Sequence, residues 1–306
     1  MPARSAREPE HGAAGPLGSA GFWVFLALLI TGFLRSLLHL AVAALGSDLN
    51  SYILLVPAVS AYFFITERDR LAPAFTRSIG IAAVPFAFAV TALAFATIPG
   101  GRFHALSEND QLSLLMFSFV GLLWSGGYFF LGSSWMRQAA FPMFFLIFLV
   151  PLPDPAVAWI ENGLRLGSAE AANMLFALTG TPAVRSNTVF QLPNITIEVA
   201  QECSGVRSTW VLLITAIIAA KMFLTKARSR LALIAAVIPL GIARNGFRIL
   251  VIGLLCVHVD PNMINSIIHR QGGPLFFAMS LVPLLLGLWL LKRRETMGSA
   301  RGAHST

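Results

Sequence analysis

One short polar stretch, Gln201 to Arg207, places a cysteine directly before a long apolar run. If a helix begins near Ser204, its unpaired backbone N–H groups and its dipole favour negative charge on the Cys203 sulfur. Arg207 follows one helical turn later and adds to that effect. A thiolate is the form that attacks carbonyl carbon, so the pattern predicts a nucleophile. The competing interpretation is that Cys203 is a small apolar residue packed in a helix interface.

A second group of polar residues lies inside the apolar segment Leu231–Val257, which contains Arg244, Asn245 and Arg248. Such residues cost several kcal/mol in a membrane unless they face a protein interior or a wet cavity, so they are expected to be functional. Arg248 lies roughly 25 Å along this helix at 1.5 Å per residue, and Arg244 is one turn deeper on the same face. The competing interpretation is an ion pair with one of three carboxylates, those of Glu198, Glu202 and Asp260.

A third segment supplies an imidazole, because His269 lies just before the last apolar run. A thiol, a base and a cation are the parts needed for acyl transfer. The imidazole takes and returns a proton, and the guanidinium stabilises a thiolate or an oxyanion. His258 remains an alternative base. The other cysteine, Cys256, lies inside an apolar run and is interpreted as a packing residue.

The composition defines the elements that must position these side chains. The chain is 56% hydrophobic and 12% charged, and a water-soluble domain of this length could not bury so much apolar surface. The formal charge of +8 comes from short loops and the C-terminus, which indicates membrane topology rather than nucleic-acid binding. Two cysteines form no disulfide framework, and without a CxxC or a His-rich pair we expect no metal and no other cofactor.

The sequence therefore predicts an all-α polytopic membrane protein with about eight transmembrane helices. The expected spans are Gly21–Leu40, Ser51–Ile65, Ile79–Ile98, Leu112–Leu131, Arg137–Leu152, Ser204–Phe223, Leu231–Val257 and Pro274–Leu291. A shorter segment, Leu166–Leu178, is expected to be re-entrant or to lie in the membrane interface. We expect a disordered tail over residues 1–20, a single transmembrane domain over 21–291 with its catalytic part at 141–291, and a basic tail over 292–306.

Lysine and arginine predict the orientation in the cell (inner) membrane. Positive residues collect in alternate loops and in both tails, so these loops and both termini should be cytoplasmic. The remaining loops, near 101–109, 153–202 and 258–273, should lie outside. Cys203, Arg248 and His269 then share the outer boundary of the membrane, which favours a catalytic role for Cys203.

The longest outer loop, Pro153 to Glu202, has features of its own. The sequence Pro151-Leu152-Pro153 should end a span sharply, because proline cannot continue a helix. Asn187–Val199 mixes β-branched residues with partial alternation, which predicts a short extended hairpin on the membrane surface. This element could hold an extended peptide by strand addition or serve only as a structural cap.

Three short motifs of the chain resemble those of the exosortase/archaeosortase family. The similarity lies in Glu202 to Arg207, in Asn245-Gly246-Phe247-Arg248, and in His269 followed by Gly273 and Phe276-Phe277. Pro151-Leu152-Pro153 and Leu192-Pro193 also fit, and the resemblance covers about 141–291. It departs from the family at Pro274, where many members have an aromatic residue, and Arg244 matches no family position.

The resemblance implies a sorting transpeptidase with Cys203, Arg248 and His269 as catalytic residues. Its partners would be membrane lipid and exported proteins with a C-terminal tail of a short motif (Pro-Glu-Pro type), a transmembrane helix and a basic cluster. It also implies a thioester intermediate and a link to exopolysaccharide production. Arg207, Arg244 and Asn245 are candidate substrate-binding residues, and an arginine suits an acidic residue of the motif.

A second class of function stays open at this stage. A multi-pass transporter, or a membrane subunit of polysaccharide export, would also keep arginines facing a cavity. Such a protein needs no thiol at the outer face, so its function would survive Cys203→Ala. The absence of HExxH, GxGD and GxSG sequences at helix starts argues against other intramembrane proteases.

Overall fold

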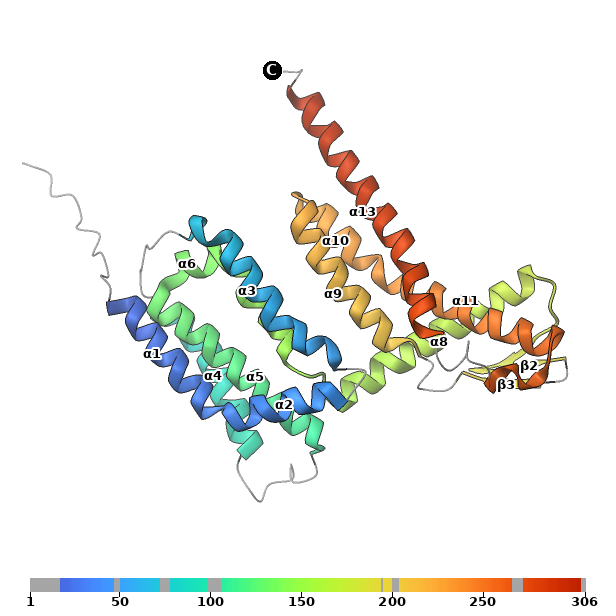
Figure 1. The fold of residues 1–306 in the computed structure, drawn as a ribbon, viewed down its shortest axis with the longest axis horizontal. Helices are drawn as coiled ribbons and strands as arrows, with labels where there is room; N and C mark the ends of the chain where they lie inside the picture. The colour runs from blue at the N-terminus through green and yellow to red at the C-terminus, as the bar shows by residue number, and fades with distance from the viewer. Residues whose placement is uncertain are drawn as a thin grey trace, which may run out of the picture. The chain divides into compact units, whose positions relative to one another are not determined.

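The computed structural model describes residues 17–46, 50–71, 78–97, 106–193, 195–199, 204–265 and 272–303. The chain divides into two compact units, residues 1–154 and residues 155–306 (Figure 1). Residues 1–16 of the predicted N-terminal tail lie outside the described residues, and residues 17–20 already belong to the first helix.

The described part of the first unit is helical. Its helices are α1 (Leu17–Gly32), α2 (Leu34–Gly46), α3 (Leu55–Glu67), α4 (Ile79–Thr97), α5 (Glu108–Gly126), α6 (Gly132–Gln138) and α7 (Ala140–Phe145). Ser107 caps α5, since its side chain accepts a hydrogen bond from the Asp110 backbone N–H at 3.0 Å. Helices α4 and α5 approach closely at Gly121, where an added Cβ would lie 2.9 Å from Ala89 Cβ.

The second unit contains every described residue for which the sequence predicts a catalytic or substrate-binding role. Its helices are α8 (Asp154–Leu178), α9 (Val206–Phe223), α10 (Ala227–Ala235), α11 (Val237–His258) and α13 (Gly273–Ala303). Between α8 and α9 lies an antiparallel sheet in the order β1 (Val184–Ser186), β2 (Val189–Leu192), β3 (Ile195–Glu198).

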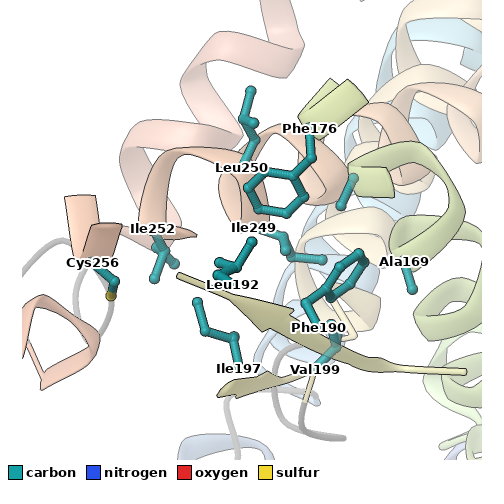
Figure 2. Packing of buried hydrophobic residues seen from close by; sticks show 11 residues of the cluster. Ala169, Phe176, Phe190, Leu192, Ile197, Val199, Ile249, Leu250, Ile252 and Cys256 are labelled. Atoms are coloured by element: carbon teal, nitrogen blue, oxygen red, sulfur yellow. The ribbon is translucent and has the colours of Figure 1, made fainter. Parts of the chain in front are cut away.

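One face of the sheet is apolar and packs on two helices. Phe190 and Leu192 from β2 and Ile197 from β3 are buried against Phe176 of α8 and Ile249 of α11 (Figure 2). We call this set the sheet cluster, together with the other buried residues Ala169, Ala172, Val199, Leu250, Ile252 and Cys256. Alternation explains it, because successive side chains of a strand point to opposite faces and Thr196 and Glu198 are exposed.

A second apolar set, which we call the helix cluster, joins four helices. Leu212 of α9, Leu233 of α10, Val237 of α11 and Leu284 of α13 are all buried within it. Beyond it, Glu295 of α13 accepts hydrogen bonds from the backbone N–H groups of Thr225 at 2.9 Å and Lys226 at 3.0 Å. This carboxylate ties α13 to the turn between α9 and α10.

The predicted class, a helical membrane protein with a small extended element, is confirmed. Within the described residues five helices are long and apolar enough to cross a membrane, or up to seven if each of two bent pairs is one span. The predicted Gly21–Leu40 span is one such pair, since α1 and α2 meet at 63°. The predicted Ser51–Ile65 span corresponds to the apolar helical stretch Ser51–Glu67, which includes α3 and is too short to count among these spans.

The region expected to be a long outer loop differs most from the prediction. Helix α8 begins directly after Pro153 and runs for 25 residues, so Leu166–Leu178 is its second half. Many strong helix formers in this segment explain the helix, and Pro155 is tolerated in its first turn. The predicted hairpin is present as β2 and β3, and β1 joins it through a turn in which Asn187 has φ 56°.

We expect Gly246→Ala to destabilise the second unit. A Cβ at this position would lie 2.7 Å from Ala171 Cβ and 3.1 Å from the Ala172 backbone nitrogen. Helices α8 and α11 would have to separate, at a cost of about 1–3 kcal/mol. Thermal unfolding of the detergent-purified protein measures the loss. The control is Gly163→Ala on α8, where a Cβ meets nothing within 4 Å and stability should hold or rise. Equal melting temperatures for the two variants would contradict this packing.

Candidate functional site

Helix α11 passes through both apolar clusters, and its polar residues lie between them. Val237 near its start belongs to the helix cluster, while Ile249 and Ile252 belong to the sheet cluster. In the turn between these ends Arg244 is 8% exposed and Asn245 is 2% exposed. A guanidinium at such a depth needs hydrogen-bond acceptors, because burying it without them costs several kcal/mol.

The acceptors of Arg244 belong to the start of α9. Its Nη2 donates to the Gly205 carbonyl oxygen at 3.1 Å and to the Thr209 hydroxyl at 3.1 Å. The Thr209 hydroxyl donates to the same carbonyl at 2.8 Å. Arg244 Nη1 is also buried and makes no hydrogen bond within the described ranges. Arg244 forms no ion pair with a described carboxylate, and Glu202, one of the three partners considered, lies outside the described residues.

Gly205 is the residue that lets α9 start so close to α11. It has φ +76°, a conformation that glycine adopts without steric cost, and it immediately precedes the first helical residue, Val206. A Cβ there would lie 3.1 Å from Arg244 Nη2 and 3.2 Å from Asn245 Cγ. The helix start predicted near Ser204 is thus confirmed, and Arg207 is exposed in its first turn.

Arg248 lies one turn beyond Arg244 and is half-buried. Together with Asn245 and with Glu198 of β3 it lines a small cavity of about 30 Å³. The remaining lining is apolar and comes from Ile197, Val199, Ile249 and Ile252. The cavity has room for a water molecule or a small polar group. Arg248 and the strand β3 therefore face one common space.

Two predicted catalytic residues, Cys203 and His269, lie outside the described residues. Their described neighbours in the chain both contact the same part of α11. Gly205, two residues after Cys203, packs against Arg244 and Asn245. Phe276, seven residues after His269, is buried with its ring 6.4 Å from that of Phe247, the residue before Arg248. The flanking segments converge on the turn from Arg244 to Arg248.

Two other residues with suitable chemistry, His258 and Cys256, lie away from the turn that holds Arg244 and Arg248. His258 is exposed in the last turn of α11, about 15 Å beyond Arg248 along the helix axis. Cys256 is 1% exposed inside the sheet cluster, so its predicted packing role is confirmed. Over the described residues no group of three His, Cys, Asp or Glu side chains is placed to hold a metal ion.

Thr209 and Ser168 are polar residues of this region that the sequence analysis did not identify. Thr209 supports Arg244, and the Ser168 hydroxyl is buried in α8 without a hydrogen bond to a described residue. The sequence indicates Thr209 only weakly, through its position one turn after the glycine that starts α9. No sequence feature indicates Ser168, since α8 was not expected to pack on α11.

We predict that Gly205→Ala lowers stability more than the same change at Gly180. Both glycines have positive φ, +76° and +69°, so alanine costs each about 1–2 kcal/mol of backbone strain. Only at Gly205 would the Cβ also press on Arg244 and Asn245, whereas at Gly180 it meets nothing within 4 Å. Unfolding midpoints of both variants isolate the contact. A Gly180→Ala variant that is equally or more destabilised would argue against it.

Comparison with known proteins gives a match that covers most of the chain. Residues 44–286 match the protein family described as transmembrane exosortase (Exosortase_EpsH). No curated protein sequence and no solved structure matches the chain. The matched range includes α9, α11 and the first turns of α13, and therefore every segment of the candidate site. The chain belongs to the transmembrane exosortase family, a group of multi-pass, cysteine transpeptidase-like sorting enzymes.

Proposed function

We propose that this protein cleaves the C-terminal sorting signals of exported proteins, with Cys203 as nucleophile, His269 as general base and acid, and Arg248 as the stabilising cation. The substrates would carry a Pro-Glu-Pro type motif, a transmembrane helix and a basic cluster. Family membership supports a sorting transpeptidase acting on proteins that carry sorting signals. A role beside exopolysaccharide production is part of the same proposal.

The reaction is an acyl transfer in two steps. The Cys203 thiolate attacks the carbonyl carbon of the scissile peptide bond and forms a C–S bond. The tetrahedral oxyanion, stabilised by Arg248, collapses as the C–N bond breaks, and protonated His269 gives its proton to the leaving amine. Water or an amine then attacks the thioester, His269 takes the proton from this nucleophile, and the thiolate leaves.

The observation that carries the proposal is the convergence of the two flanking segments on α11. Cys203 is two residues from Gly205 and therefore within about 7 Å of it along an extended chain. Gly205 itself is fixed to Arg244, one turn from Arg248. His269 precedes Gly272 by three residues, a reach of roughly 10 Å, and Gly272 precedes the turn of α13 whose Phe276 contacts Phe247. These distances suit a shared site.

The charges of the second unit support an outer location for this site. Lys226, Arg228 and Arg230 lie at the start of α10, near the Thr225–Glu295 contact, and Lys292 Nζ lies 5.4 Å from the Phe223 ring centre at the end of α9. Gly205 is at the opposite end of α9. If the basic end is cytoplasmic, together with both chain termini, the site faces outward.

Arg207 is the better placed of the two arginines proposed to recognise an acidic residue of the motif. It is exposed in the first turn of α9 and follows Cys203 by four residues in the sequence. Arg244 is buried, and one of its terminal nitrogens is already bonded to Gly205 and Thr209. Asn245, on the cavity that Arg248 lines, remains a candidate for holding the substrate backbone.

The first test of the proposal is substrate processing in cells. With a tagged substrate carrying such a tail, Cys203→Ala and Cys203→Ser should each abolish the mass shift, because neither side chain supplies a thiolate. Cys256→Ala is the matched control and should retain processing, since Cys256 is buried in the sheet cluster, away from Arg248. All variants must be present in the membrane at equal amounts. Processing by Cys203→Ala would favour the transporter alternative.

A second test addresses motif recognition. We expect Arg207→Ala to reduce the preference for an acidic over a neutral motif residue by roughly tenfold, the value of a partly exposed charged hydrogen bond. A charge reversal, Arg207→Glu with a lysine in the motif, should restore part of the processing. Arg244→Ala is measured beside it. If neither arginine variant alters the preference, the acidic residue is recognised elsewhere.

A further inference from the structure

The sheet of the second unit has one open edge whose geometry follows from its register. Glu198 pairs with Val189 and Ile197 with Phe190, and the Val199 N–H donates to the Thr188 carbonyl at 3.0 Å. Hydrogen-bonded and non-hydrogen-bonded pairs alternate along an antiparallel ladder. Ile195 and Ile197 therefore point their backbone groups toward β2, whereas Thr196 and Glu198 point theirs outward.

This outer edge of β3 is accessible in the described structure. No backbone hydrogen bond from a described residue reaches it, and the side chains of Thr196 and Glu198 are exposed. Ile197 of β3 and Val199 directly after it are buried in the sheet cluster, and Ile195 packs against it, so one face of the strand is held by the core. An edge with unpaired N–H and C=O groups is a ready template for another extended chain.

The opposite edge of the sheet is a poorer template. By the same alternation β1 directs only the backbone groups of Arg185 outward, because Val184 and Ser186 pair with β2. The Arg185 side chain folds back over the adjoining turn, with its Nε donating to the Asn187 carbonyl at 2.6 Å and its guanidinium paired with Glu170. An added strand would find two outward residues on β3 and one on β1.

Strand β3 is also the element that leads to the proposed nucleophile. Its last residue, Glu198, precedes Cys203 by five positions. Glu198 also lines the same small cavity as Arg248. A chain added beside β3 would lie about 4.8 Å from it in the plane of the sheet. It would then lie beside a strand whose last residue is five positions from Cys203 in the sequence.

We propose that the outer edge of β3 binds an extended segment of the substrate, next to the scissile bond, as a fourth antiparallel or parallel strand. The N–H groups of Thr196 and Glu198 donate to substrate carbonyls, and their own carbonyls accept from the substrate. This inference rests on the proposed function. A Pro-Glu-Pro segment suits such an edge, because the two prolines, two residues apart, both direct their backbone to the same side of the added strand. That side can face away from β3, where no N–H is needed. The glutamate between them then directs its N–H and C=O toward β3.

A proline scan of β3 tests the backbone contact. Thr196→Pro removes an outward N–H and places a ring on the open edge, while every described bond to β2 stays intact. We expect processing to fall about tenfold or more, from the lost hydrogen bond and the steric block. Thr196→Val keeps the backbone N–H and changes the side chain alone, so it should process about tenfold or more faster than Thr196→Pro. Equal rates for Thr196→Pro and Thr196→Val would overturn the proposal.

Crosslinking gives a readout that does not depend on turnover. In a Cys203→Ala, Cys256→Ala background, a substrate with one cysteine in its motif should form a disulfide with Thr196→Cys. The control is Val184→Cys, also exposed, which lies on the far edge of the sheet at a distance of roughly 14 Å from the added strand. Crosslinking at Val184→Cys that equals or exceeds that at Thr196→Cys would overturn the proposal.

The two hypotheses fail differently. If Cys203→Ala abolishes processing but Thr196→Pro does not reduce it, strand addition is wrong and the nucleophile stands. If Cys203→Ala processes normally, the proposed function is wrong, and crosslinking at Thr196 no longer reports a catalytic complex.

Discussion

A buried guanidinium determines how the second unit is assembled. Arg244 lies between two apolar clusters, so its donors must find oxygen atoms within the protein. The Gly205 carbonyl and the Thr209 hydroxyl supply them. Any shift of α9 along α11 would leave a charged group without acceptors, at a cost of several kcal/mol. The position of the chain beside Cys203 is thus set by an interaction that does not involve Cys203.

The two apolar clusters hold different parts of this arrangement. The helix cluster packs α9, α10 and α13 around the start of α11, and the Glu295 carboxylate fixes the far end of α13 to the turn at Thr225. The sheet cluster holds β2 and β3 against α8 and the later part of α11 (Figure 2). Polar side chains on rigid helices are positioned more precisely than side chains on loops. The polar turn between the clusters meets that requirement.

Hydropathy and charge predicted the class of the protein and its apolar segments, because both depend on composition over about twenty residues. The break between α1 and α2 was not predictable in this way, since both halves are equally apolar. Nor was α8, whose first half is polar enough to be taken for a loop. Strand β1 has three residues, too few to show a period of two. Alternation did locate β2 and β3, the strands with a buried face.

For the site, the sequence gives depth in the membrane but not rotation about each helix axis. Counting residues placed Arg248 and the segments of Cys203 and His269 at one level, yet residues at one level can face away from each other. The contacts of Gly205 with Arg244 and of Phe276 with Phe247 supply the missing rotation. Arg248 follows Arg244 by four residues, which is a rotation of about 40° and a rise of about 6 Å. The face of α11 that fixes the start of α9 is therefore also the face that presents Arg248 to the cavity beside β3.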